Sequence, residues 1–462
     1  MHVVMRTALH LPELPEEKVD PEPKTTPPEG LDLGNIDDLS DSLSQLLQHV
    51  DLFVSVISRI SEIHPFAKFA CSVLTMAYKV VAAQRERDDR FRQLIKVTSD
   101  VFVFATKLEM SVLEGHRRTI KLLVLQTTEC AYFIRDYTKQ KSFIIRAGST
   151  FLSGGAINDK IAEYEKKFQD LKAAFLLDSA LNTEIAVLRI AEQIDRIVTA
   201  GELDDLPYAA ARFDREKQCL EGTREAILEK IFTWVNNTDT DTSRVLLLNG
   251  APGTGKSAIA NTVSQRFDEL RRLGSSFFFL RAKPERSPDR VFTTIARDMA
   301  DLDQGWEVAL KQVAAPRALR RTESIREQFE EFILKPARRL PVYFGPVVIV
   351  IDALDAVGST RGGQTLISLL ALRIAELPSN FRIIITARPD THIRDAFRDH
   401  KGVEWWPMDT AIEDWENSNL EDIEKFFNTE FPSIVGSSWS PKLCHKLVLI
   451  SEGDFGWATS AC

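Results

Sequence analysis

Residues 244–267 read RVLLLNGAPGTGKSAIANTVSQRF, and this stretch decides the fold of the region around it. The apolar run 245–248 predicts a short buried strand. Residues 250–257, GAPGTGKS, have the Walker A spacing of two glycines around four residues, followed by lysine and serine. After them, Ile259, Val263 and Phe267 recur at helical spacing. Strand, glycine-rich loop and helix in this order are the context that a phosphate-binding loop requires.

The residue types of this loop explain how it would hold a phosphate group. Glycines let backbone N–H groups curl around phosphate oxygens without a Cβ in the way. The helix that opens at Lys256 directs its positive dipole end at the same anion. We expect Lys256 to reach the terminal phosphates and the Ser257 hydroxyl to bind Mg²⁺. The predicted nucleotide-binding residues of the loop are Gly250, Ala251, Pro252, Gly253, Thr254, Gly255, Lys256, Ser257 and Ala258.

Composition and charge bound the class of protein. The chain of 462 residues is 44% apolar and 27% charged, which is typical of a globular protein with two or three domains. Its net charge of −9 gives no basis for expecting a nucleic acid as partner. The five scattered cysteines show no metal-ligand spacing and suit a reducing compartment. The most apolar long run, 66–83, carries two lysines and predicts a helix in a bundle, and no secretory signal is visible, so we expect a cytoplasmic location.

The first 200 residues predict a leader followed by an all-α module. Residues 1–35 are rich in proline and acid and are expected to be disordered, because they have little apolar surface to bury. From 36 to 200, apolar residues recur at spacings of three and four, which predicts a bundle of four helices plus long, brace-like helices. The glycine-containing segment 146–156 is expected to be a flexible connection, with helical periodicity over 157–175 and 185–198.

The second half of the chain alternates between strand and helix patterns. A linker and pre-loop segment is expected at 201–222, and an NTPase core at 223–410. Apolar strands are predicted at 245–248, 275–280, 347–355 and 382–390, with helices at 223–235, through Ile295, at 324–334 and through Leu366 and Leu377. Near-continuous apolar strands between helices predict a parallel sheet covered on both faces, with phosphates at the carboxyl ends of the strands. The predicted fold class is therefore multidomain α plus α/β, a helical bundle followed by a P-loop NTPase sheet.

Residues 411–462 are expected to form part of a helical lid. The sequence stops at FGWATSAC, within a helical pattern. We expect either a short form of the protein or a truncated gene model.

Three charged residues that follow the apolar runs of the predicted strands complete a candidate site. Asp352 ends the apolar run 347–351, where P-loop proteins hold Mg²⁺ beside the hydroxyl of the loop, so Ser257 and Asp352 are the predicted metal ligands. Asp355 is the next acid that can face the cleft, with a helix N-cap as the alternative role. Arg388 follows a strand at a place where a cation would sense the terminal phosphate, and an ordinary surface arginine is the alternative. We assign Asp355 and Arg388 as candidate catalytic residues.

The second half of the sequence resembles the NACHT-type NTPase module of fungal NLR-like proteins, which are STAND-class ATPases, and the nephrocystin-like NTPase domains close to them. The resemblance spans 208–462 and is carried by GAPGTGKSAIANTV (250–263), IDALD (351–355), LLALRIAELPSNF (369–381) and RIIITARPD (382–390). It implies that Gly222, Thr223 and Arg224, in the segment before the loop, lie near the nucleotide base. It favours ATP over GTP, with Mg²⁺, as cofactor.

The helical half resembles the N-terminal domain of mixed-lineage kinase domain-like proteins and related fungal cell-death bundles. The resemblance is carried by SEIHPFAKFACSVLTMAYKVVAAQRERDDR (61–90) and ECAYFIRDYTKQKSF (129–143). It implies an executioner that acts on membranes or a signalling adaptor, with membrane recruitment and homo-oligomer formation on activation. Basic residues between Arg117 and Arg146 give this region a mildly positive character, which a solvated helix face explains equally well.

One position departs from the family pattern. The family usually places a glutamate after the second aspartate of this segment, whereas Ala356 follows Asp355 here. A group that orients the attacking water contributes about 10²–10⁴-fold to a rate, so we expect nucleoside triphosphate hydrolysis to be slow or absent while binding persists.

Three functions are compatible with these patterns. The first is a nucleotide-dependent regulatory switch of the NLR-like type, in innate immunity or programmed cell death, that controls the helical bundle. The second is a working ATPase of the motor or remodelling type, which Ala356 disfavours. The third is a membrane-permeabilising or adaptor bundle joined to a degenerate NTPase domain.

Overall fold

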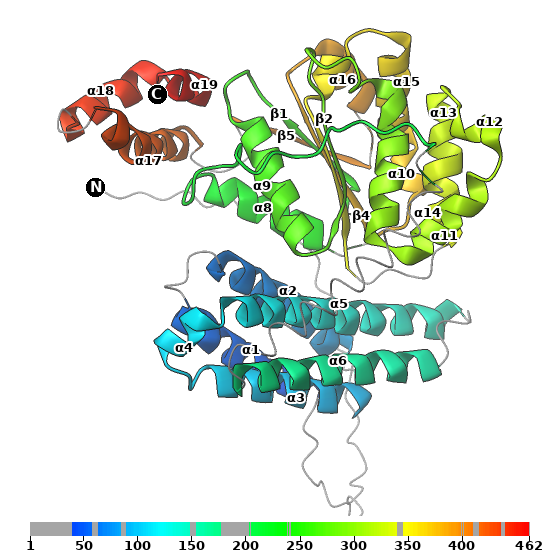
Figure 1. The fold of residues 1–462 in the computed structure, drawn as a ribbon, viewed down its shortest axis with the longest axis vertical. Helices are drawn as coiled ribbons and strands as arrows, with labels where there is room; N and C mark the ends of the chain where they lie inside the picture. Colours follow the sequence, from blue (N-terminus) through cyan, green and yellow to red (C-terminus); the bar gives the residue numbers. More distant parts are fainter. Residues whose placement is uncertain are drawn as a thin grey trace, which may run out of the picture. The chain divides into compact units, whose positions relative to one another are not determined.

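The computed structural model describes residues 39–57, 63–84, 89–147, 154–176, 203, 205–237, 239, 242–339, 345–398, 400, 402–409, 415–435 and 439–461 (Figure 1). These residues all fall within one compact unit, residues 38–462. The expected leader and the helical pattern at 185–198 lie outside the described residues.

The N-terminal part of the described chain is a helical bundle. Its helices are α1 (Leu39–Val56), α2 (His64–Gln84), α3 (Asp89–Ala105), α4 (Met110–Gly115), α5 (Arg117–Ala147) and α6 (Gly154–Leu176). Their apolar stripes meet in one core, in which the Phe53 and Phe102 rings pack edge to face with centroids 5.3 Å apart. The predicted connection at 146–156 is partly wrong, since α5 continues to Ala147 and α6 begins at Gly154. Packing of Ile157 and Ile161 into the core stabilises that first turn despite its glycines.

The composition of α2 is compatible with a membrane-spanning helix and with a core helix of the bundle. Its segment Pro65–Ala83 is long and apolar enough to cross a membrane, a test that the core helix of a soluble protein also passes. In the structure, Val73, Leu74, Ala77 and Val81 of this helix are buried in the bundle core. The packing therefore agrees with the prediction of a bundle helix.

The second half contains the predicted parallel sheet. Its strands are β1 (Val245–Asn249), β2 (Leu273–Phe278), β3 (Val347–Asp352), β4 (Phe381–Ala387) and β5 (Val403–Pro407), in the order β2-β3-β4-β1-β5 with every neighbouring pair parallel. This confirms the predicted fold class of α plus α/β. Strand β3 ends at Asp352, earlier than predicted, because Ala353 takes a left-handed conformation (φ 56°) and a 3₁₀ turn, η5 (Leu354–Val357), follows. The pattern analysis did not predict β5, which carries Trp405 and Trp406.

Helices cover both faces of the sheet (Figure 1), and alternate residues of β1 pack into different hydrophobic clusters. Leu246 and Leu248 of β1 pack with α8 (Glu225–Asn236) and α9 (Lys256–Glu269) on one face. Val245 and Leu247 pack on the other face with α10 (Val291–Leu302), α11 (Gln304–Val313) and α15 (Arg361–Leu372). Because both faces are covered, the strands are apolar along their whole length.

Shorter elements complete this layer. They are η3 (Pro288–Arg290), α12 (Arg317–Arg320), α13 (Ile325–Gln328), the π-helical turn η4 (Phe329–Leu334), α14 (Lys335–Arg339), η6 (Ile374–Glu376) and α16 (Thr391–Phe397). The helix predicted to reach Leu377 instead ends at Leu372. Pro378 follows Leu377 and biases that residue to the extended conformation that it has, ψ 157°.

Two further segments frame the sheet. The stretch expected as a linker packs closely, since Leu206, Ala209 and Ala211 are buried and the Phe278 N–H donates to the Ala211 carbonyl at 2.8 Å. After β5, the helices α17 (Trp415–Val435), α18 (Pro441–Ser451) and α19 (Phe455–Ser460) share a small core of their own. We call these three helices the lid.

Side chains of the bundle contact the half of the chain that contains the sheet. The Phe69 ring of α2 packs on Phe267 of α9, with centroids 6.0 Å apart. Lys121 Nζ lies 3.0 Å from Glu269 Oε2, also on α9. The buried Tyr132 hydroxyl donates to Asn236 Oδ1 at 2.5 Å. Helix α9 therefore begins at the phosphate loop and ends against the bundle.

Candidate nucleotide-binding site

The phosphate loop leaves the carboxyl end of β1 and enters α9 at Lys256. Gly253 and Gly255 have φ angles of +80° and +87°, in the left-handed region that favours glycine. Gly250 has little space around it, since a Cβ there would lie 2.8 Å from Met408 Cγ. The glycines are therefore required by the backbone path of the loop, which is a concave cradle for an anion.

Lys256 folds back over its own loop. Its Nζ donates to the carbonyl oxygens of Gly250 and Ala251, at 2.7 and 2.6 Å. Burial lowers the pKa of Lys256 to about 8, and the nearby Asp355 and Asp352 carboxylates only partly offset that effect. A bound phosphate would replace these carbonyl groups as the acceptor for Lys256 Nζ, and its negative charge would make the hydrogen bonds stronger.

A chain of hydroxyl and carboxyl groups joins the loop to the middle of the sheet. Ser257 Oγ donates to Asp352 Oδ2 at 2.8 Å, and Thr386 Oγ1 donates to Asp352 Oδ1 at 2.5 Å. The Ala353 N–H donates to the same Thr386 oxygen at 3.0 Å. Asp352 is 4% exposed, and this burial raises its pKa in spite of the two hydrogen bonds. Strand β4 lies between β1 and β3, and for this reason Thr386 can reach Asp352.

Asp355 and Arg388 form a pair at the same edge of the sheet. The Arg388 N–H donates to Asp355 Oδ1 at 3.0 Å, and Arg388 Nε lies 3.5 Å from Asp355 Oδ2. The Arg388 side chain is 57% exposed. Asp355 is thus neither an N-cap nor a free carboxylate, and it orients the backbone and side chain of Arg388.

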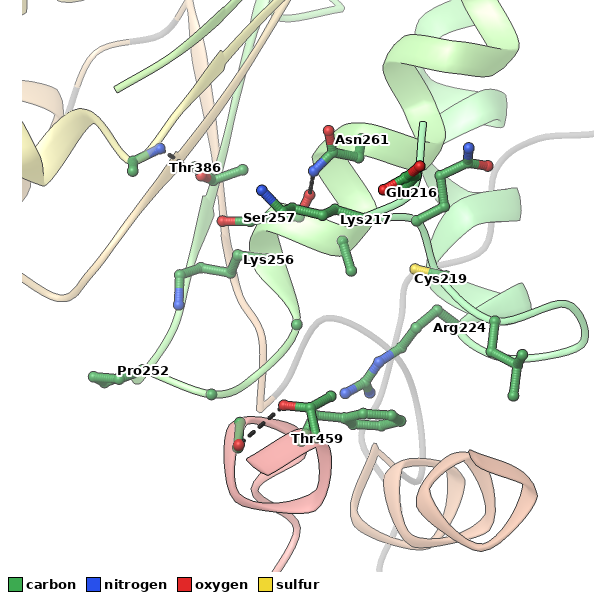
Figure 2. Close-up of a pocket in the computed structure, with 18 of the residues that line it drawn as sticks. Glu216, Lys217, Cys219, Arg224, Pro252, Lys256, Ser257, Asn261, Thr386 and Thr459 are labelled. Carbon is green, nitrogen blue, oxygen red and sulfur yellow. Dashed lines mark hydrogen bonds between the residues drawn. The ribbon is translucent and has the colours of Figure 1, made fainter. Parts of the chain in front are cut away.

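These groups open onto a cavity of about 1120 Å³, large enough for a nucleotide. Of the predicted site residues, its wall includes Thr223, Arg224, Pro252, Gly253, Gly255, Lys256, Ser257, Ala258, Asp355 and Arg388. Gly222, Gly250, Ala251, Thr254 and Asp352 lie outside the lining. Figure 2 shows Lys256 and Ser257 on the loop and helix, Thr459 on the lid, and Arg224 extending from the segment before α8 toward Thr459.

The segment before the loop is held by the lid. Lys425 Nζ donates to the Gly222 carbonyl at 2.9 Å. The Thr223 hydroxyl donates to the Leu220 carbonyl at 2.7 Å. Arg224 has a left-handed backbone, φ 58°, and its N–H donates to Asp422 Oδ2 at 2.9 Å. Thr223 and Arg224 are buried, so neither presents a freely accessible polar side chain to the cavity.

The donor set of the site suits Mg²⁺. Mg²⁺ is usually bound through one or two protein oxygen ligands, with phosphate oxygens and water completing its shell. Ser257 and Asp352 supply one hydroxyl and one carboxylate that already converge at 2.8 Å. Within the described residues, no group of three or more His, Cys, Asp and Glu side chains could hold a metal ion. Magnesium bound at Ser257 and Asp352 would share its coordination shell with the phosphates of a ligand, whose charge it would neutralise.

Two residues of this region were missed by sequence reasoning. Thr386 is the last residue but one of β4 and seemed part of an apolar strand, although a hydroxyl in an otherwise aliphatic run was a usable signal. Asp454 precedes α19 and lies against Gly253, where its carboxylate would overlap any added Cβ. Its position depends on how the lid folds back, and no local pattern contains that information.

The fold and the site together define a P-loop NTPase-like domain. Residues 222–388 match the family model described as nephrocystin 3, N-terminal. The chain is also 26% identical over 186 residues to the mitochondrial Lon protease homolog of Candida dubliniensis, a match that covers 35% of this chain. The chain spans 16% of the length of that relative. The central region is therefore similar to a nephrocystin-type, NTPase-related domain.

Proposed function

We propose that this protein is a nucleotide-dependent regulatory switch of the NLR-like type. Its phosphate loop binds ATP, or GTP, together with Mg²⁺, and the bound state controls the N-terminal helical bundle. The NACHT resemblance and the nephrocystin-type match at 222–388 support this class of function. The bundle acts as the signalling or cell-death effector, recruited from the cytoplasm to a membrane and forming homo-oligomers when activated.

The observation that carries the proposal is the placement of α9. Its first residue, Lys256, belongs to the phosphate loop, and its last residue, Glu269, pairs with Lys121 of the bundle. A helix of 14 residues spans about 20 Å as one stiff body. A nucleotide that repositions the start of α9 therefore changes the contact at its far end, which is a way for one ligand to bias two arrangements.

Two features of the cavity wall support slow or absent hydrolysis. Ala356 lines the cavity where the related family usually has a glutamate, and Asp355 is engaged by Arg388. Within the described part of the cavity wall, Glu216, Glu221 and Glu430 are the glutamates, and none of them follows a strand of the sheet. The site holds nucleotide more readily than it activates water.

Titration calorimetry of the full chain with ATP·Mg²⁺ and GTP·Mg²⁺, together with phosphate release, tests this function. We expect saturable binding with turnover far below one per second. Lys256→Ala removes a charge-assisted contact worth about 1.5–3 kcal/mol and should weaken binding about ten- to a hundredfold. Unchanged affinity in Lys256→Ala would contradict the site, and several turnovers per second would favour a working ATPase.

A second function has one observation in its favour. The Pro65–Ala83 helix is apolar enough to cross a membrane, which is compatible with a membrane-permeabilising bundle beside a degenerate NTPase domain. Dye release from anionic liposomes by the full chain, with and without nucleotide, separates the two. Dye release that is the same with and without nucleotide would favour the second function.

A further inference from the structure

Arg224 occupies an unusual place between the phosphate loop and the lid. Its guanidinium lies between the rings of Trp415 and Phe455, 4.6 Å from each ring centroid. Trp415 begins α17 and Phe455 begins α19, so one side chain contacts two lid helices. The Arg224 side chain is 3% exposed, and the interaction of a cation with aromatic faces is strongest when it is desolvated in this way.

The same guanidinium contacts the loop. Arg224 Nη2 donates to the Thr254 carbonyl at 3.1 Å. Close to it, the Gly456 N–H of α19 donates to the Gly253 carbonyl at 3.3 Å. The lid and Arg224 thus bind two successive carbonyl groups of the phosphate loop.

Because of peptide geometry, these two contacts also affect the direction of the neighbouring backbone N–H groups. A trans peptide is planar, so its N–H points away from its C=O. The Gly253 carbonyl shares a peptide with the Thr254 N–H, and the Thr254 carbonyl shares one with the Gly255 N–H. Fixing the direction of the two carbonyls therefore also fixes the direction of the two N–H groups, from which a phosphate would accept hydrogen bonds.

We propose that Arg224 is a positioning residue that couples the phosphate loop to the lid, so that nucleotide binding and the seating of the α18–α19 turn stabilise each other. This inference rests on the proposed function, because it assumes that a nucleotide enters the loop. It differs from the role that the resemblance implies for Arg224, which is proximity to the base.

Burial makes Arg224 sensitive to the position of the lid. Asp422 of α17 is its carboxylate neighbour, with Oδ2 3.9 Å from Nε, and burial lowers the pKa of Arg224 and raises that of Asp422. Arg224 Nη1 has no hydrogen-bond partner among the described residues. If the lid leaves, the guanidinium loses both rings and this carboxylate together, and the Thr254 carbonyl is no longer held in place. Thermodynamic linkage makes the coupling reciprocal.

The test uses the full chain and two readouts. The first is the affinity for fluorescent ADP and ATP with Mg²⁺, and the second is hydrogen exchange of peptides covering 441–460 with and without nucleotide. In the wild type we expect nucleotide to slow exchange in these peptides. In Arg224→Gln we expect affinity to fall about tenfold, within the usual range of coupling, and the effect of nucleotide on exchange to disappear. Arg224→Lys, which keeps the cation, should recover part of both effects.

Two further variants keep the result interpretable. Phe455→Leu removes one ring while preserving an apolar contact, and it should show a smaller loss of the same kind that is not additive with Arg224→Gln. Arg394→Gln, at a side chain that is 52% exposed and far along the chain from the loop, is the control and should change neither readout.

The outcomes separate the two proposals. Loss of affinity in Arg224→Gln with a normal nucleotide effect on lid exchange would make Arg224 a direct ligand and overturn the coupling. A disturbed lid with unchanged affinity would also overturn it. A wild-type chain that binds no nucleotide would overturn the proposed function and the coupling together.

Discussion

The Ser257 hydroxyl donates to Asp352 Oδ2 at 2.8 Å, so two side chains 95 positions apart meet at one point beside the phosphate loop. Ser257 belongs to the first turn of α9 and Asp352 is the last residue of β3. Both are oxygen donors of the kind that Mg²⁺ prefers. Their separation in sequence and proximity in space make the pair a direct test of the metal site.

Asp352→Asn should weaken nucleotide binding only when Mg²⁺ is present. The substitution keeps the size of the side chain and one acceptor oxygen, but it replaces the other oxygen with a donor NH2 and removes the charge that would bind the cation. We expect a loss of about 1.5–3 kcal/mol, or ten- to a hundredfold, in titrations with Mg²⁺, and little change in EDTA. Asp395→Asn, at an exposed carboxylate, is the matched control. Equal losses with and without Mg²⁺ would contradict the assignment of Asp352 as a metal ligand.

Thr386→Val should destabilise the fold and weaken the Mg²⁺ dependence together. Valine has the shape of threonine but leaves the buried Asp352 Oδ1 and the Ala353 N–H without the Thr386 hydroxyl. We expect the free energy of unfolding to fall by about 1–3 kcal/mol in urea titrations. Thr386→Ser retains the hydroxyl and should recover most of the metal dependence. A valine variant with wild-type stability and wild-type metal dependence would contradict a role for the Thr386 hydroxyl.

Ala356→Glu should accelerate hydrolysis. Ala356 lines the cavity from within η5, four positions after the last residue of β3, so a longer carboxylate side chain there has room to approach a water molecule. We expect phosphate release to rise by about 10²-fold or more, with nucleotide affinity changed little. Ala356→Gln controls for size without charge. If both variants leave turnover at the wild-type level, the absence of hydrolysis has another origin.

Asp298 should make stability depend on pH. Burial raises the pKa of Asp298 to about 6, in a position where Ser275 and Tyr208 hydroxyls donate to its two oxygens. Because this folded-state pKa is above the ordinary value of 3.8, the group's stabilising effect is fully present below 3.8 and is lost as pH rises through about 6. The free energy of unfolding of Asp298→Asn should therefore exceed that of wild type by about 1–3 kcal/mol at pH 8.

The stabilities of wild type and Asp298→Asn should become equal at low pH. Near pH 4 the wild-type carboxyl is protonated in the folded state, so its stability should approach that of Asp298→Asn. Urea unfolding followed at several pH values measures the difference. A difference that is constant with pH would contradict the raised pKa of Asp298.

Tyr132→Phe should loosen the contact between bundle and NTPase-like half. The Tyr132 hydroxyl bonds to Asn236 Oδ1, and its ring lies 4.9 Å from the Arg135 guanidinium and 5.0 Å from that of Arg272. Removing the hydroxyl leaves a buried acceptor unpaired, at a cost of about 1–3 kcal/mol. Hydrogen exchange in 120–140 should become faster. Tyr78→Phe, at a partly exposed tyrosine of α2, is the control, and equal effects of both variants would contradict a specific contact.

Local patterns predicted the parts of the site that are contiguous in sequence. The 250–257 motif, the strand before it and the helix after it all occur where the spacing placed them, because glycine conformations and helical periodicity depend on near neighbours. The positions after strands were also informative: Asp352 and Arg388 both follow buried runs. Whether these residues bind nucleotide and metal remains a prediction.

Tertiary structure decided what these residues contact. The sequence by itself determined a parallel α/β sheet with a phosphate loop and a helical module before it, since period and turn chemistry are local properties. Only the strand order, which inserts β4 between β1 and β3, brought Thr386 to Asp352. Only the packing of the lid against the sheet domain encloses Arg224 between Trp415 and Phe455. These lid residues lie about 200 positions further along the chain. Contacts over such separations depend on how whole layers pack, and no short stretch of sequence encodes that packing.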